Sequence, residues 1–173
     1  MSITLYDLTV PTYLQTLGAV GGFLEKGLAH CREHGLDPEK IVEARIHPDM
    51  LPFRFQIHSV AHHSAGTMAA LESGVFRPDR GAPDANYAAL QAEIAAARAA
   101  LEKLTPEAVN ARAGADVVFE IGERKMPFAA ANFVLSFSLP NFHFHAATAY
   151  DILRAEGVAL GKRDYMGALR LKA

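Results

Sequence analysis

The sequence predicts an all-α protein, a four-helix bundle with a small β-hairpin before the last long helix. Four long stretches repeat apolar residues at three- and four-residue steps, the spacing of an amphipathic helix. One short stretch before the fourth of them alternates apolar and polar residues, which favours strands. The chain has 173 residues, a length that suits one domain over residues 1–173. We therefore expect helices packed around one core.

The first long helix is expected to begin at Thr9, which can cap it, with Pro11 in its first turn. Gly35 follows its expected end. The apolar face expected for this helix consists of Leu14, Leu17, Gly21, Leu24, Leu28 and Cys31. A shorter helical piece should follow within residues 36–46, opened by Asp37 and the proline after it.

The second long helix is expected over residues 52–73, ended by Gly74. Its expected core row is Phe53, Ile57, Val60, Ser64, Met68 and Leu71. Residues 75–85 are rich in proline, aspartate and glycine, which predicts a loop. The third helix has the most regular pattern, an unbroken seven-residue repeat formed by Tyr87, Leu90, Ile94, Ala97, Leu101 and Leu104.

Residues 116–128 are expected to form the hairpin, with its turn at Gly122. The fourth helical stretch should run over residues 129–156 and end at Gly157. Pro140 lies inside it and is expected to kink or interrupt the helix. Residues 158–173 are expected to form an irregular tail packed on the body.

Composition excludes several classes of function. Lysine and arginine total 17 against 19 acidic residues, so the formal net charge is −2. This balance provides no basic surface for nucleic acid or for an anionic membrane. No window is long and apolar enough to span a bilayer, and the N-terminus does not read as a targeting segment. Cys31 is the single cysteine. It excludes an intramolecular disulfide and favours a cytoplasmic protein.

Helical geometry separates the histidines of the second and fourth helices. His63 is expected at the border of the second helix's apolar stripe, where a partner helix can reach it. His58 and His62 have the i, i+4 spacing of a ligand pair but are expected to face outward as solvated side chains. In the fourth helix, His145 is expected to face inward and His143 to point away.

Asn141 borders the same inward face, one turn before His145. A buried imidazole needs a partner, which the sequence leaves open as a side chain, a water or a metal. One interpretation is structural, a polar pair that ties two helices together with help from Thr148 or Tyr150. Another is catalytic, with His145 as a general base oriented by Asn141. A ligand cleft lined by Phe142, Tyr150 and Met68 would favour apolar or aromatic groups.

Four segments together resemble a bacterial family known only as a domain of unknown function, within the DinB/YfiT-like superfamily. The resemblance covers essentially the whole chain in the expected order. The segments are Leu5-Tyr6-Asp7-Leu8-Thr9-Val10-Pro11-Thr12, Ala44-Arg45-Ile46-His47-Pro48-Asp49-Met50-Leu51-Pro52, Leu139-Pro140-Asn141-Phe142-His143-Phe144-His145 and Leu160-Gly161-Lys162-Arg163-Asp164-Tyr165.

The resemblance implies a DinB-like four-helix bundle, often dimeric. It also implies a divalent metal held by three histidines, one from the second helix and two from the fourth. The second-helix ligand would be His63 and the last would be His145. Asn141 stands where the remaining histidine is expected. His62 or His143 could be the third ligand only if its helix were rotated from the orientation expected here.

Two functions follow as expectations. The first is a hydrolase or thiol transferase that acts on a small molecule and uses nickel, zinc, iron or manganese bound by His63 and His145. The alternative is a non-catalytic, metal-free bundle that is dimeric or binds a small ligand. In the alternative, the His63, Asn141 and His145 cluster is structural. Whether the protein is an enzyme is left open, and a homodimer is expected in both cases.

Overall fold

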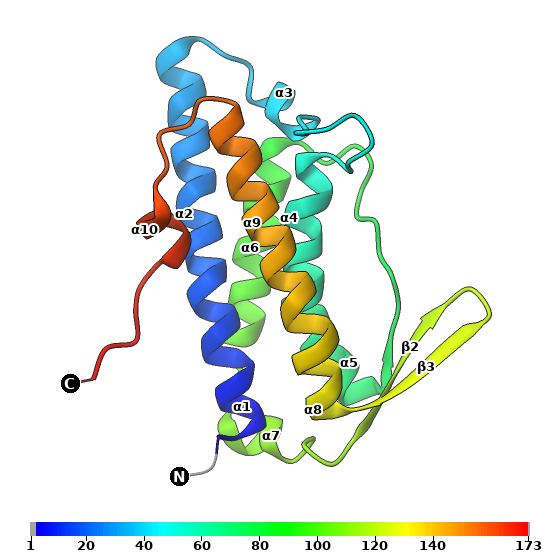
Figure 1. Ribbon diagram of the computed structural model, residues 1–173. Coiled ribbons are helices and arrows are strands. Elements are labelled where there is room, and N and C mark those ends of the chain that lie inside the picture. Colours follow the sequence, from blue (N-terminus) through cyan, green and yellow to red (C-terminus); the bar gives the residue numbers. More distant parts are fainter. Residues whose placement is uncertain (1–2, 173) are drawn as a thin grey trace.

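Helix α2 (Val10–His34) runs the length of the molecule in the computed structural model, which describes residues 3–172 (Figure 1). Three further long helical stretches lie beside it. They are α4 (Phe53–Ala61) continued by α5 (Thr67–Ser73), α6 (Tyr87–Leu101), and α8 (Ala130–Phe133) continued by α9 (Leu139–Ala155). A small sheet projects from the end where α5 and α8 meet (Figure 1). The predicted mainly helical fold is confirmed.

The main core lies between these helices. α4 packs against α6 and α9, and α2 packs against the same two helices from the other side. The largest side chains buried there are aromatic: Tyr13, Phe23, Phe53, Tyr87 and Phe142. A second apolar cluster lies at the sheet end and includes Phe76, Val117 and Phe133.

The expected apolar face of α2 is confirmed in part. Leu17, Leu24 and Cys31 are buried, and Leu14, Gly21 and Leu28 are partly buried. The buried surface also extends over Tyr13 and Phe23, because α2 carries two overlapping apolar rows. Thr9 does not cap α2 through its side chain, because its hydroxyl donates to the Leu5 carbonyl of the short helix α1 (Leu5–Leu8).

The rows expected in the second and third helices are confirmed in the main. Phe53, Ile57, Val60, Ser64 and Leu71 are buried, and Met68 is partly buried. The α6 repeat is buried from Tyr87 to Leu101. Short helices not expected as such are α7 (Pro106–Asn110) and α10 (Lys162–Met166), while α3 (Pro38–Val42) corresponds to the expected short piece.

The hairpin is confirmed as β2 (Asp116–Ile121) and β3 (Arg124–Ala129), which pair antiparallel. Gly122 forms its turn with a φ of 57°, which glycine adopts without strain. The expectation of a loop throughout 75–85 needs one correction. Val75–Phe76 forms strand β1, parallel to β2, because Phe76 is drawn into the second apolar cluster.

Pro140 does not interrupt the last helix. The helix remains continuous because a π-helical turn, Val134–Ser138, directly precedes α9 and widens the backbone ahead of the proline. A second π turn, His62–Gly66, joins α4 to α5. The C-terminal segment packs on α2 as expected, but α10 makes it partly helical. Within residues 3–172, no helix is both long and apolar enough to cross a bilayer.

Candidate functional site

His63 and His145 meet at one side of the helical body. Their ring centroids are 5.9 Å apart and their planes are within 14° of parallel. His63 comes from the π turn after α4, and His145 from α9. Both line a cavity of about 370 Å³, together with Asn141. The structure therefore brings the three residues singled out by the sequence to one place.

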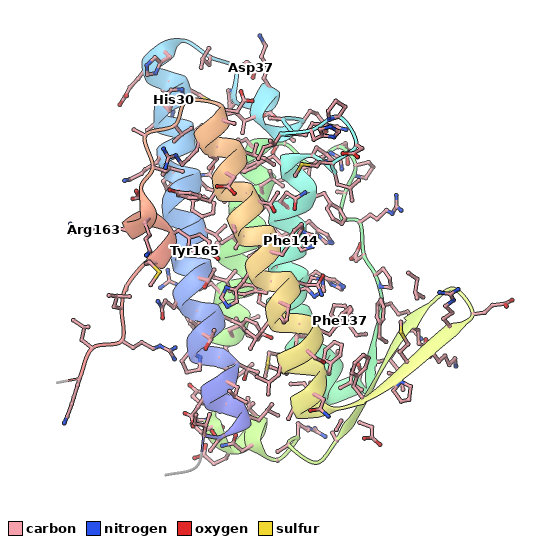
Figure 2. The ribbon with its side chains drawn as sticks, viewed as in Figure 1. His30, Asp37, Phe137, Phe144, Arg163 and Tyr165 are labelled. Atoms are coloured by element: carbon pink, nitrogen blue, oxygen red, sulfur yellow. The ribbon has the colours of Figure 1, made fainter. Side chains whose placement is uncertain are left out.

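Aromatic rings form much of the wall of this cavity. Phe55 comes from α4, Phe76 from β1, Phe119 from β2 and Phe137 from the second π turn. Phe137 lies on the side of its helix that faces the hairpin (Figure 2), with its ring centroid 4.7 Å from that of Phe119. The polar atoms of the site are thus set among flat apolar surfaces, the usual composition of a small-molecule pocket.

Gln56 is the partner of His145, the partly buried imidazole in α9. Its side chain is only 3% exposed, and its amide nitrogen donates to the Leu51 carbonyl at 2.8 Å. That bond turns the amide oxygen toward His145, whose Nδ1 lies 2.8 Å away. Because an amide oxygen only accepts, Nδ1 of His145 is the donor. In the neutral ring, Nε2 then carries a lone pair.

Burial keeps both imidazoles uncharged. Loss of hydration lowers the pKa of His145 to about 4. The same effect, reinforced by the proximity of His145 and His62, lowers the pKa of His63 to about 3. Nδ1 of His63 is buried and has no hydrogen-bond partner among the described residues. An unpaired buried group of this kind costs about 1–3 kcal/mol.

A polar network in the core supports the backbone of His63. The Ser138 hydroxyl donates to the His63 carbonyl at 2.8 Å. The same hydroxyl oxygen lies 2.7 Å from the hydroxyl oxygens of Tyr13 and Thr67. Ser138 ends one π turn and His63 lies in the other. Carbonyls in a π turn are displaced from the regular helical ladder, and π turns are frequent at functional sites.

His58 and His62 are not solvated, and that expectation needs correction. Both are half-buried, because residues 77–81 cover the outer face of α4. His58 Nδ1 lies 2.6 Å from Glu93 of α6 and its Nε2 lies 3.6 Å from Asp79, and these contacts raise its pKa. His62 contacts the Arg77 carbonyl at 2.8 Å. Helical periodicity alone could not show that a loop covers these two side chains.

Two residues expected beside the histidines lie elsewhere. The Thr148 hydroxyl donates to the Phe144 carbonyl within α9. Tyr150 packs against Phe23 and Tyr165 on the α2 side. Neither residue lines the cavity of His63 and His145. Tyr150 follows His145 by five residues, which turns it to another face of the helix, whereas Thr148 shares the face but spends its hydroxyl on its own helix.

The expected cleft of Phe142, Tyr150 and Met68 does not form. Phe142 is fully buried against Tyr13, with ring centroids 4.9 Å apart, and is core. Met68 lines a separate small hollow beside α7. Cys31 is also buried, and burial raises the pKa of its thiol. His143 is exposed, as expected.

The donor set does not fit the three-histidine metal site that the resemblance implies. His63 and His145 supply two nitrogens, and the third position is Asn141, whose amide nitrogen donates to the Phe137 carbonyl at 2.7 Å. A neutral amide oxygen is a weak ligand for nickel or zinc. Over residues 3–172, no three histidine, cysteine, aspartate or glutamate side chains are grouped to hold a metal.

Sequence reasoning missed Gln56 and Phe76. Gln56 precedes His63 by seven residues, so both lie on one face of the second helix. A glutamine in an otherwise apolar row was the available signal. Phe76 offered no comparable signal in the sequence, because it lies in a segment rich in turn residues.

The comparisons with known proteins agree with this architecture. The family model described as domain of unknown function DUF1993 matches residues 5–166. Among solved structures, the chain is similar to a DinB family member protein from Shewanella denitrificans, with a TM-score of 0.81 and 26% identity. The match covers 98% of this chain and 95% of that one. No curated protein matches. The chain therefore belongs to the family of the domain of unknown function DUF1993.

Proposed function

We propose that this protein is a DinB-like four-helix bundle that binds a small, largely apolar molecule in the cavity between His63 and His145. The observation that carries the proposal is a cavity of about 370 Å³ walled largely by phenylalanines, with the uncharged imidazoles of His63 and His145 among the polar groups that line it. Ligand pockets typically combine such apolar walls with a few polar groups that fix orientation.

Acid–base catalysis by the histidines is less well supported. A general base works best when its pKa is near the working pH. The pKa of His145 is lowered to about 4, so its neutral ring binds protons weakly at pH 7. Its orientation is set by Gln56 and not by Asn141, which bonds to its own helix. These features suit a hydrogen-bond acceptor better than a base.

The competing function is the metal-dependent hydrolase or thiol transferase that the family resemblance implies. Two neutral imidazoles on facing elements favour it, since unprotonated nitrogens are the form that binds metals. Asn141 weighs against it, because the three-histidine set is incomplete.

The test combines ligand and metal measurements on untagged protein. Binding of naphthalene-sized aromatic probes is measured by NMR, with wild type beside Phe137→Ala and His145→Ala and with Phe144→Ala as the control. Phe144 is exposed on the same helix and does not line the cavity. Saturable binding that the first two changes weaken, with no stoichiometric metal on elemental analysis, supports the proposal. Near-stoichiometric metal lost in folded His145→Ala would favour the competing function.

A homodimer is part of the proposal. Leu135 and Phe144 are 50% and 62% exposed on one long helix, and exposed apolar side chains of this size favour association. Light scattering across a concentration series tests it. A cytoplasmic location also remains a proposal, supported by the single buried cysteine.

A further inference from the structure

Gln56 fixes which ring nitrogen of His145 is the hydrogen-bond donor. The chain of contacts runs from the Leu51 carbonyl, through the Gln56 amide, to Nδ1 of His145. Each link has one permitted direction, because a carbonyl only accepts and the amide nitrogen only donates. The amide cannot be reversed without placing its oxygen against the Leu51 carbonyl, so Nδ1 of His145 holds the proton.

The other ring nitrogen is the one left for a ligand. Nε2 of His145 has no hydrogen-bond partner in the described part of the chain, and the ring lines the cavity. Phe55 packs edge-on against the imidazole at 5.7 Å, and His63 lies parallel to it. The Asn141 amide nitrogen is already used within its own helix. Nε2 of His145 is therefore a fixed acceptor in a cavity walled largely by phenylalanines, with Ser59 and Asp79 also in its lining.

We propose that Gln56 is a specificity-determining residue, and that the cavity selects planar aromatic molecules bearing a hydroxyl or ring N–H donor, which the Nε2 lone pair of His145 accepts. This inference rests on the proposed binding function and names its ligand class. A molecule that lacks the donor, or that presents an anion to this nitrogen, leaves the lone pair unmatched. Sites built to hydrogen-bond a hydroxyl reject analogues without one.

The first experiment needs no ligand. Nitrogen NMR of ¹⁵N-histidine-labelled wild-type protein at pH 7 reports which ring nitrogen of His145 is protonated. The expected result is a protonated Nδ1 and a bare Nε2. A bare Nδ1 or a fully protonated ring would overturn the inference, even if the cavity binds ligands.

The second experiment compares three probes of one size: 2-naphthol, its methyl ether and 2-naphthoate. Wild type should bind the naphthol about tenfold more tightly than the ether, as expected for one buried hydrogen bond, and the naphthoate most weakly. In Gln56→Met the naphthol preference should fall to about threefold or less. Gln91→Met is the matched control, since Gln91 bonds to Glu25 away from the cavity.

The outcomes separate the two proposals. Equal binding of naphthol and ether by wild type overturns the donor preference but leaves the binding function in place. Preference for the naphthoate also overturns it. Failure of all three probes to bind overturns the binding function and, with it, the ligand class. Should Gln56→Met not fold, the histidine spectrum of wild type still decides whether Nδ1 of His145 holds the proton, and Gln56→Glu replaces Gln56→Met in the probe comparison.

Discussion

The imidazole ring of His63 lies nearly parallel to that of His145, at 5.9 Å between centroids, and both rings are uncharged at neutral pH. Their burial links the pH to the stability of the fold. In the unfolded chain a histidine takes up a proton near pH 6.5. In the folded protein these two take it up only near pH 3 and 4.

Stability should therefore fall on acidification. Between about pH 6.5 and pH 4 the unfolded state binds more protons, so each histidine lowers the free energy of unfolding by up to about 1.4 kcal/mol per pH unit. His63→Leu should flatten this slope and leave stability at pH 7 unchanged within about 1 kcal/mol, because it removes an unpaired nitrogen. Urea unfolding from pH 4 to 8 measures it, with exposed His34→Gln as the control. An unchanged slope in His63→Leu would contradict the prediction.

His58 should act in the opposite direction. Glu93 raises its pKa, so its stabilising contribution is fully present below about pH 6.5 and is lost as pH rises through the higher, folded-state value. Glu93→Gln should cost about 1 kcal/mol at pH 6 and less at pH 9. Unfolding curves at the two pH values test this. The control is Glu102→Gln, because Glu102 caps the end of α6 and forms an exposed ion pair with Arg98. Equal losses at both pH values would refute the assignment.

Ser138→Ala should be strongly destabilising. It removes the hydroxyl that joins Tyr13, Thr67 and the His63 carbonyl in the core. The Thr67 hydroxyl still donates to the His63 carbonyl at 3.1 Å, so the buried Tyr13 hydroxyl is the group left unpaired, at a cost of about 1–3 kcal/mol. Ser136→Ala is the matched control: Ser136 is exposed in the same π turn and should change stability by less than about 0.5 kcal/mol. Chemical unfolding of both variants decides the matter, and similar losses would mean that the network contributes little.

Gly27 shows how closely α2 approaches α6. The Tyr87 hydroxyl donates to the Leu24 carbonyl at 2.8 Å, and a Cβ at Gly27 would lie 2.4 Å from that hydroxyl. Gly27→Ala should therefore cost about 2 kcal/mol or more, because Tyr87 must move. Gly22→Ala, with nothing within 4 Å on the same helix, should stabilise by about 0.5–1 kcal/mol. Thermal unfolding compares the two, and opposite signs are the expected result.

The sequence predicted the helices well because their apolar repeats are long and regular. The α6 repeat is buried from Tyr87 to Leu101, and the hairpin turns at Gly122 as expected. The face of α2 was predicted in part, because a second apolar row that includes Tyr13 and Phe23 is buried beside Leu17, Leu24 and Cys31. The π turns were not predictable, since no residue pattern distinguishes them from an ordinary helix.

The site was predicted in part for the same reason. His63 and His145 have clear helical phases, so their proximity followed from periodicity and the resemblance, although His145 is only partly buried. Gln56 and Phe76 depend on which helices face each other and on a strand of two residues, which are tertiary facts. The covering of His58 and His62 by residues 77–81 is also a feature of the tertiary structure that periodicity does not reveal.

Asn141 provides the sharpest test of the metal question. Its side chain lines the same cavity as His63 and His145, one helical turn before His145. Asn141→His would complete three imidazoles, a set that suits zinc or nickel with an open position. We expect untagged wild-type protein to carry no stoichiometric metal, and Asn141→His to bind about one zinc per chain and to unfold at a higher temperature when zinc is added.

Asn141→Gln controls for the larger side chain at that position. The double variant Asn141→His with His63→Leu shows whether the two histidines of α9 bind zinc without His63. Neither should bind stoichiometric zinc, because each lacks one of the three imidazoles. Elemental analysis and thermal unfolding with and without zinc measure these outcomes. Stoichiometric metal in wild type would mean that two histidines suffice, and the metal-dependent function would then replace the proposed one. Failure of Asn141→His to gain metal would mean that the three positions do not converge on one point.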